Sequence, residues 1–339
     1  MKTINHLKFD PLESFILYDA KLFQFQAFAS WVRQFPCSIG LQAGEDLKTL
    51  KSYAEALHQI QTIAAAKKLD RHFIFVAIGG GSVTDFVGFL AATYQRGHPW
   101  IAVPSTWLCA VDSAHGGKNG LNLNGVKNQV GTIHFPKDVL ICEQLLKLQP
   151  KERLLESAGE ILKITLLSSA KAFNSFELDS DHVVKNLNSY IAMKNAIVKK
   201  DPFETKKIRY RLNFGHTVGH VFESEKLWPH GIAILFGMIF AIHFSVHKKI
   251  LPKVEAKAIL EKIRDSVFDL KLQQLLREAF IISEDDVIKK LSQDKKTTGK
   301  KVNFIFLKKR GQALVKPVLG SDILTAFHEL KNKESFFDV

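Results

Sequence analysis

The stretch that decides the fold is HFIFVAIGGGSVTDFVGFLAATY, residues 72–94. It opens with a short apolar run of aromatic and β-branched residues, which is typical of a buried strand. Three glycines, Gly79 to Gly81, end this run, and a second apolar segment beginning near Ser82 predicts a helix. A strand, a glycine turn and a helix in this order are typical of a parallel α/β sheet.

The same glycine turn is a candidate ligand site. Residues without a Cβ let the backbone approach a phosphate, and the N-terminus of a following helix offers unpaired N–H groups and a partial positive charge. The pyrophosphate of a dinucleotide would fit there. The GxGxxG fingerprint is absent, so a tight turn that binds nothing explains the three glycines equally well.

Further strands and helices alternate around this turn in the first half of the chain. Residues 14–19 and 100–106 are apolar runs that predict strands, and residues 47–69 have the periodicity of a helix. From about residue 150 the pattern changes, because long segments with helical periodicity cover residues 152–167, 181–200, 230–250 and 260–280. We therefore expect a Rossmann-like α/β domain over 1–148 and a mostly α-helical domain over 149–339, with a short hairpin around Arg310-Gly311.

Length and composition narrow the class of protein. A chain of 339 residues with 46% hydrophobic content can fill two domains. The N-terminus has no apolar signal region, and no uncharged apolar stretch of about 18 or more residues is evident, so we expect a cytoplasmic protein without a membrane span. Three cysteines without CxxC spacing, Cys37, Cys109 and Cys142, argue against a disulfide framework and a zinc ribbon.

The net charge of +13 favours anionic partners. The basic residues are scattered, and no nucleic-acid-binding module is recognisable, so we do not expect nucleic acid to be the partner. A phosphorylated or carboxylated metabolite fits the charge better.

Two polar segments of the first half are candidate ligand contacts. Within AGEDLK, residues 43–48, Glu45 could bind a ribose diol and Lys48 a phosphate, although ordinary surface charges at a helix start explain them too. Residues 111–131, VDSAHGGKNGLNLNGVKNQVG, look like a polar glycine-rich loop near the carboxyl end of a strand, where open α/β sheets bind ligands. Its ammonium and amide groups come from Lys118, Asn122, Lys127 and Asn128, and Asp112 adds a carboxylate.

The helical half carries a cluster of candidate metal ligands. Glu160 and Lys163 lie three residues apart, on one face of a helix, where a plain salt bridge would also account for them. His216 and His220 are spaced i, i+4, and His230 starts the next apolar helix. One carboxylate with imidazoles is a common ligand set of catalytic zinc. The residues alone leave open a metal site, an acid/base pair or structural histidines.

Five segments together resemble the motifs of the 3-dehydroquinate synthases and of the wider sugar phosphate cyclase superfamily. They are GGGSVTDFVGFLAATYQRG (79–97), VPSTWLCAVDSAHGGKNGLNLNGVKNQVG (103–131), AGEILK (158–163), LNFGHTVGH (212–220) and HGIA (230–233). Their order and spacing match from about Gly44 to Lys296. The resemblance implies an NAD-binding N-terminal domain and a helical C-terminal domain.

The resemblance also implies roles for single residues. Glu160, His216 and His230 correspond to ligands of a divalent metal, Zn²⁺ or Co²⁺, whereas His220 corresponds to a residue that contacts the substrate phosphate and transfers a proton. The residues that correspond to contacts of the phosphate and neighbouring oxygens are Lys118, Asn128, Arg209 and one of Lys295 or Lys296. Those that correspond to contacts of the substrate carboxylate and hydroxyls are Lys163, Lys194 and Asn213.

A further set is implied for the dinucleotide and for assembly. The positions where the family binds NAD are Glu45, Lys48, Gly79, Gly80, Gly81, Asp85, Thr106, Asp112 and Lys127. Arg96 corresponds to an arginine that reaches the phosphate bound by a neighbouring subunit, which implies a homodimer.

The implied reaction converts 3-deoxy-arabino-heptulosonate 7-phosphate to 3-dehydroquinate in the shikimate pathway of aromatic amino acid biosynthesis. NAD oxidises a ring hydroxyl, phosphate is eliminated, NADH returns the hydride, and the opened enol closes by aldol addition. The net reaction is a phosphate-releasing cyclisation that recycles NAD.

The sequence departs from the family pattern at four places. Ile232 stands where HGE would have glutamate, Thr84 where glycine is usual and Asn119 where threonine is common, and one extra residue lies between Lys194 and Arg209. A cyclase of another sugar phosphate, similar to 2-epi-5-epi-valiolone synthase, therefore stays open, as do an NAD- and metal-dependent polyol dehydrogenase and a binding protein without catalysis. A basic residue at 194, with Arg209 and Asn213, favours a carboxylated substrate.

Overall fold

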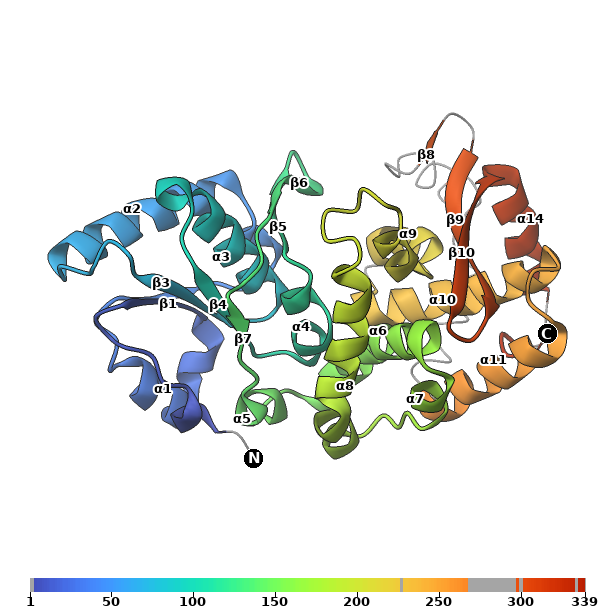
Figure 1. Ribbon diagram of the computed structural model, residues 1–339, viewed down its shortest axis with the longest axis horizontal. Coiled ribbons are helices and arrows are strands. Elements are labelled where there is room, and N and C mark those ends of the chain that lie inside the picture. The colour runs from blue at the N-terminus through green and yellow to red at the C-terminus, as the bar shows by residue number, and fades with distance from the viewer. Residues whose placement is uncertain (1–2, 226–227, 268–296, 299–300, 333–334, 339) are drawn as a thin grey trace. The chain divides into compact units, whose positions relative to one another are not determined.

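The computed structural model describes residues 3–225, 228–267, 297–298, 301–332 and 335–338 (Figure 1). The chain divides into two compact units, Met1–Arg153 and Leu154–Val339. The first is an α/β unit with a five-stranded sheet, and the second is mostly helical, so the predicted fold class is confirmed.

The sheet of the first unit is parallel throughout. Its strand order is β2-β1-β3-β4-β7. The strands are β1 (Ser14–Asp19), β2 (Ser38–Leu41), β3 (Ile74–Gly79), β4 (Trp100–Pro104) and β7 (Asp138–Val139). The helices are α1 (Gln26–Val32), α2 (Leu50–Ala66), α3 (Gly81–Thr93), α4 (Trp107–Val111) and α5 (Glu143–Lys147), and short 3₁₀ turns include η3 (Glu45–Leu47), η4 (Tyr94–Arg96) and η5 (Ser113–His115).

Alternate residues of the central strands build two separate cores. Phe75 and Ala77 of β3 join one cluster with side chains of α2 and α3, whereas Val76 and Ile78 join another with α1 and α5. This is the period-2 alternation of a strand that is covered by helices on both faces. The carboxyl ends of β3 and β4, with the glycine turn, therefore lie at one edge of a three-layer unit.

The polar segment 111–131 was expected to be an irregular loop, and this was wrong. Residues 118–133 form an antiparallel hairpin of β5 (Lys118–Leu123) and β6 (Val126–Ile133). Asn124 and Gly125 connect the strands, with φ of 51° and 76°. Asn-Gly is the pair that a two-residue hairpin turn with two left-handed residues favours, so turn chemistry outweighs the polar composition.

The second unit consists of helices with a small antiparallel sheet. Its helices are α6 (Lys151–Ser168), α7 (Ala170–Asn174), α8 (Ser180–Val198), η6 (Arg209–Asn213), α9 (His216–Glu225), α10 (His230–His247), α11 (Lys253–Val267) and α14 (Gly320–Lys331). The sheet, in the order β10-β9-β8, contains β8 (Thr297–Thr298), β9 (Lys301–Lys309) and β10 (Gln312–Leu319). The hairpin predicted around Arg310-Gly311 is present, and residues 268–280 of the last predicted helix lie outside the described residues.

Helix α10 is the centre of the second unit. Every residue from Gly231 to Ser245 is buried, and aromatic rings of α9 and β9 pack on it, with Phe222 4.5 Å from Phe236 and Phe304 5.0 Å from Phe244 between centroids. By length and composition α10 could also cross a membrane, so the expectation that no such stretch exists was wrong. Its burial explains the composition, because a helix that is apolar all round belongs in a core.

Candidate active site

Glycines let three helices of the second unit approach closely enough to share a site. Gly159 of α6 and Gly231 of α10 lie in contact, and a Cβ on either would overlap backbone atoms of the other helix. Gly219 of α9 lies against Ala233 of α10, where a Cβ would stand 2.7 Å from the carbonyl oxygen. Because backbone meets backbone, side chains one to three residues from these glycines converge. They are Glu160 on α6, His216 at the start of α9 and His230 at the start of α10.

The three converging side chains have the spacing of a metal site. Nε2 of His216 lies 3.5 Å from Oε1 of Glu160, and Nε2 of His230 lies 3.4 Å from the same oxygen. Ligands about 2.0–2.1 Å from a tetrahedral ion are about 3.3–3.4 Å apart, so both distances fit an ion between these atoms. The donor set of one carboxylate and two imidazoles also suits Zn²⁺ or Co²⁺.

The carboxylate of Glu160 is buried with only ionic partners. Its side chain is 1% exposed, and neither oxygen takes part in a hydrogen bond among the described residues. Lys163, one helical turn on, forms an ion pair with Oε2. A buried carboxylate needs compensation, and here Lys163 compensates Oε2 while Oε1 faces the two imidazoles. Oε1 is therefore available to a cation.

His230 is held from two sides. Its Nε2 faces Glu160, and its Nδ1 hydrogen-bonds Oε2 of Glu223 at 3.0 Å. Burial by itself lowers the pKa of His230, but the nearby carboxylates of Glu160 and Glu223, the latter hydrogen-bonded to the ring, outweigh burial and raise the pKa to about 9. Without a cation, this imidazole is a protonated bridge between two carboxylates. A metal at Nε2 would take the place of that proton.

His220 lies beside the three candidate ligands but outside that group. It is exposed and follows His216 by one helical turn, with the two rings 5.1 Å apart in an edge-on arrangement. A second group that could hold a cation combines His220, Glu223 and His230. The exposed imidazole can exchange protons with solvent, as a group that moves a proton must.

A buried arginine and its loop add positive charge to the second unit. Arg209 is 4% exposed, and its guanidinium donates to the carbonyl of Pro202 at 2.9 Å. Asp201, fully buried, accepts hydrogen bonds from the backbone N–H groups of Lys206, Ile208 and Arg209. Burial would raise the pKa of Asp201, but these hydrogen bonds outweigh it and lower the pKa. Asp201 thus fixes the loop that carries Arg209.

Two other candidate substrate contacts belong to the same unit. Lys194 is buried on α8, and Asn213 is half-buried at the end of η6, two residues before the glycine that precedes His216. Lys295 and Lys296, the candidates for a phosphate contact, lie outside the described residues.

In the first unit the glycine turn joins β3 to α3. Gly79 ends the strand, Gly80 is the N-cap of α3 and Gly81 begins the helix. A Cβ on Gly80 would stand 3.1 Å from the side chain of Thr106, which itself caps α4 through the N–H of Cys109. Thr84, where glycine was usual, turns its hydroxyl back to the carbonyls of Gly80 and Gly81. The backbone at the start of α3 is therefore close-packed against Thr106.

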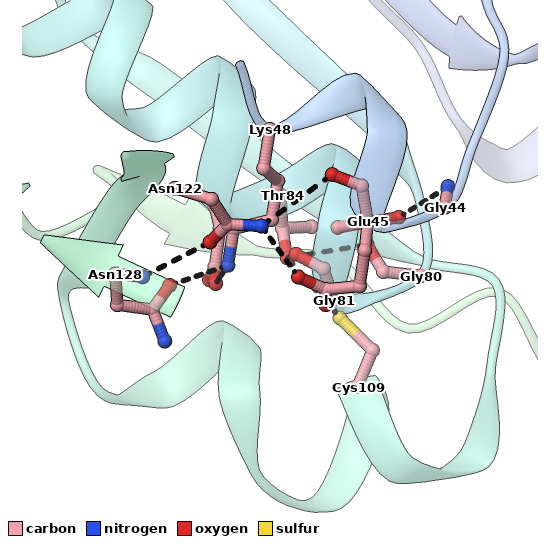
Figure 2. A network of polar contacts seen from close by, with 11 residues as sticks. Gly44, Glu45, Lys48, Gly80, Gly81, Thr84, Cys109, Asn122 and Asn128 are labelled. Carbon is pink, nitrogen blue, oxygen red and sulfur yellow. Dashed lines mark hydrogen bonds and ion pairs between the residues drawn. The ribbon is translucent and has the colours of Figure 1, made fainter. Parts of the chain in front are cut away.

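Lys48 is the centre of a polar network beside this turn (Figure 2). The side chain is 3% exposed, and its ammonium contacts Oδ2 of Asp85 at 2.7 Å and Oδ1 of Asn128 at 2.6 Å. Burial raises the pKa of Asp85, and the Lys48 charge offsets part of that rise. Asn122 donates to the carboxylate of Glu45 at 2.8 Å and accepts from the N–H of Asn128 at 3.0 Å. The network ties the hairpin to η3 and α3.

This network changes how the candidates of the first unit are grouped. The side chain of Asn128, expected among the substrate contacts, accepts a hydrogen bond from the candidate NAD residue Lys48, whose ammonium also contacts the candidate NAD residue Asp85. Lys118 and Lys127 stand exposed on the hairpin, and Asp112 follows the end of α4. Arg96 is exposed and has a left-handed backbone with φ of 74°.

Two residues that organise these sites, Glu223 and Asp201, were not among the candidates inferred from sequence. Asn122 was a candidate ligand contact, but its hydrogen bond to Glu45 was not inferred. A signal existed only for Glu223, because it follows His216 and His220 at i+7 and i+3 on one helix face.

Comparisons with known proteins agree over most of the chain. A family model described as 3-dehydroquinate synthase N-terminal matches residues 38–156, and one described as 3-dehydroquinate synthase C-terminal matches residues 157–297. The chain is 33% identical over 300 residues to a 3-dehydroquinate synthase of Campylobacter concisus, covering 86% of this chain and 84% of the relative. It is 35% identical over 302 residues to one of Dehalococcoides mccartyi, covering 86% and 81%.

Solved structures share the fold. A 2-deoxy-scyllo-inosose synthase complexed with carbaglucose-6-phosphate, NAD⁺ and Co²⁺ aligns with a TM-score of 0.78 and 23% identity, covering 94% of this chain and 90% of that one. A 2-epi-5-epi-valiolone synthase from Streptomyces hygroscopicus with NAD⁺ and Zn²⁺ aligns with a TM-score of 0.69 and 20% identity, covering 94% and 91%. A probable glycerol dehydrogenase from Sinorhizobium meliloti reaches a TM-score of 0.53 at 12% identity, covering 94% and 90%.

Proposed function

The chain belongs to the 3-dehydroquinate synthase family, and from this we propose that it converts 3-deoxy-arabino-heptulosonate 7-phosphate to 3-dehydroquinate and phosphate. The reaction is a phosphate-eliminating cyclisation of the shikimate pathway, a step of aromatic amino acid biosynthesis. The observation that carries the proposal is the convergence of Glu160, His216 and His230, with Nε2 of each imidazole 3.4–3.5 Å from Oε1 of Glu160.

The cofactors follow from the same family and from the two sets of residues. Related cyclases were solved with NAD⁺ and Co²⁺ or Zn²⁺, and we propose NAD at the glycine turn of the first unit and a divalent cation at Glu160, His216 and His230. Bound NAD would accept and return a hydride, and the cation would polarise the substrate oxygens. Gly80, Gly81 and the N-terminus of α3 would hold the pyrophosphate.

The chain's own residues then have distinct tasks. Phosphate leaves with the bonding electron pair, so positive charge must meet it, and the buried guanidinium of Arg209 supplies such charge. The proton from the carbon next to the transient ketone needs an acceptor, and exposed His220 can take it and exchange it with solvent. Lys163, ion-paired to Glu160, orients the substrate carboxylate in this proposal.

Two buried lysines of the second unit support a carboxylated substrate. Lys163 is 3% and Lys194 5% exposed. A buried ammonium is costly unless it is paired, and an anionic substrate adds a further partner when it binds. This favours the heptulosonate over sugar phosphates without a carboxylate, such as sedoheptulose 7-phosphate, the kind of substrate expected for another sugar phosphate cyclase.

An assay of inorganic phosphate release tests the proposal. Purified protein is incubated with NAD, Co²⁺ or Zn²⁺ and either the heptulosonate or sedoheptulose 7-phosphate. Release from the heptulosonate is the expected result. Phosphate release from sedoheptulose 7-phosphate alone points to another cyclase. Accumulation of NADH without phosphate release points to a polyol dehydrogenase. A protein that catalyses no reaction and contains no metal after purification is a binding protein.

We also propose that the enzyme is a cytoplasmic homodimer. Arg96 supports the dimer, because an exposed arginine on a left-handed backbone at the end of η4 is presented away from its own unit's core. Mixing an Arg96→Ala variant with a catalytically dead His220→Ala variant would restore part of the activity if Arg96 serves a neighbour's site.

A further inference from the structure

We propose that Glu223 positions the metal ligand His230. This inference rests on the function proposed above, but Glu223 is not among the metal ligands and substrate contacts named there. Oε2 of Glu223 lies 3.0 Å from Nδ1 of His230, on the side of the ring opposite the candidate metal position. His230 Nε2 faces Oε1 of Glu160 at 3.4 Å. The two carboxylates thus contact the two nitrogens of one imidazole.

This arrangement selects one tautomer. A carboxylate accepts a proton and does not donate one, so the neutral His230 beside Glu223 keeps its proton on Nδ1. Its Nε2 lone pair is then free and directed to the site of Glu160. A histidine that ligates a metal commonly donates its other N–H to a carboxylate or carbonyl, which fixes the ring and makes the ligand more basic.

His216, the second candidate ligand, also has a hydrogen-bond acceptor at Nδ1, but this acceptor is neutral. Nδ1 of His216 lies 3.4 Å from the carbonyl oxygen of Phe214, in its own backbone. Both imidazoles therefore direct Nε2 to Glu160 and have an acceptor at Nδ1. The acceptor of His230 is charged, because Glu223 is a carboxylate on a neighbouring helix.

The residue two positions after His230 cannot take this task. Ile232, at the position where glutamate was the usual residue, is 3% exposed and has no polar atom. Glu223 lies on α9 seven residues after His216 and three after His220, so all three side chains share one face of that helix. Helix α9 therefore provides one ligand and the partner of another.

The test measures cation binding in the full-length protein without turnover. Co²⁺ affinity is determined by competition with a chelator, and the visible absorption of bound Co²⁺ reports its coordination. Glu223→Ala should weaken Co²⁺ binding by about 10- to 100-fold and alter the Co²⁺ spectrum. Glu223→Gln should weaken it less, because the amide oxygen still accepts the Nδ1 proton but has no charge.

Glu329→Gln is the matched control. Glu329 pairs with Nδ1 of His247 at 2.7 Å, the same chemistry on α14 and α10 away from the candidate ligands. We expect Co²⁺ affinity and spectrum unchanged in this variant. If Glu223→Ala fails to fold, Glu223→Gln and Glu223→Asp, checked by circular dichroism, take its place in the comparison.

Two results would overturn the inference. In one, the Glu223 variants bind Co²⁺ with the affinity and spectrum of the wild-type protein. In the other, the wild-type protein binds two Co²⁺ and Glu223→Gln binds one, which would make Glu223 a ligand together with His220. A wild-type protein that binds Co²⁺ through Glu223-dependent coordination but releases no phosphate would contradict only the proposed function.

Discussion

Gly231 of α10 packs so tightly on Glu156 of α6 that a methyl group on Gly231 would overlap the Glu156 carbonyl oxygen. The contact lies one residue from His230 and four residues from Glu160. The backbone crossing of these helices thus sets the distance between two candidate metal ligands. Glycine at 231 is a requirement of the site as well as of packing.

Gly231→Ala should therefore separate α6 from α10 and disrupt cation binding. We expect at least a tenfold loss of Co²⁺ affinity and a loss of stability of about 1–3 kcal/mol, the usual cost of overpacking. Isothermal titration and thermal unfolding measure the two effects. Gly320→Ala is the control, since a Cβ there meets no atom within 4 Å; equal behaviour of the two variants would contradict this account.

His216 and His220 should respond differently to replacement by alanine. His216→Ala removes an imidazole whose Nε2 lies 3.5 Å from Glu160 Oε1, so both metal content and turnover should be lost. His220→Ala should keep the metal and lose turnover by about 10²- to 10⁴-fold, the usual contribution of a general acid or base. Elemental analysis and phosphate release measure both. Metal loss in the His220 variant alone would reverse this assignment.

Lys48 should stabilise the first unit through its buried contacts. Lys48→Met leaves Asp85 without its cation, and we expect a loss of about 3 kcal/mol in unfolding free energy together with weaker NAD binding. Lys51→Met, an exposed lysine on α2, is the control and should change stability by less than about 0.5 kcal/mol. A double-mutant cycle with Asp85→Asn measures the pair. Additive effects would show that Lys48 and Asp85 are not coupled.

Asp201 should support Arg209 in a pH-dependent way. Its pKa is lowered in the folded state from an ordinary 3.8, so its stabilisation is present above about pH 3.8 and is lost as the pH falls through the folded pKa. Asp201→Asn presents N–H groups to backbone donors and should displace the loop. We expect a fall of about 10- to 100-fold in kcat/KM at neutral pH. A stability difference between variant and wild type that widens on acidification would contradict this.

The fold was predictable because its signals are local. The run 72–94 contains a strand, a glycine turn and a helix, an order that is typical of a parallel α/β sheet. Strand β3 and helix α3 lie where this run predicts them. The hairpin at 118–133 was missed because polar composition was given more weight than the Asn-Gly turn. Helix α10 was overlooked as a possible membrane span, although it is long and apolar enough to qualify by length and composition.

The candidate site was predictable only in part. The ligand types of Glu160, His216 and His230 and their order are visible in the sequence, whereas their convergence depends on glycine contacts between helices that are distant in sequence. The spacing of Glu223 from His216 and His220 indicated a shared helix face, but its pairing with His230 was not predictable, because His230 lies on another helix. Asn128 could not be paired with Lys48, 80 residues away, without the register of the hairpin.

Turnover at limiting NAD tests the central claim most directly. The protein, loaded with Co²⁺, is given one equivalent of NAD and a large excess of the heptulosonate, while phosphate and absorbance at 340 nm are followed together. Because the dinucleotide is regenerated in each cycle, many phosphates should appear per NAD with no net rise at 340 nm. Phosphate that stops at one equivalent, or NADH that accumulates in step with product, would contradict a cyclase.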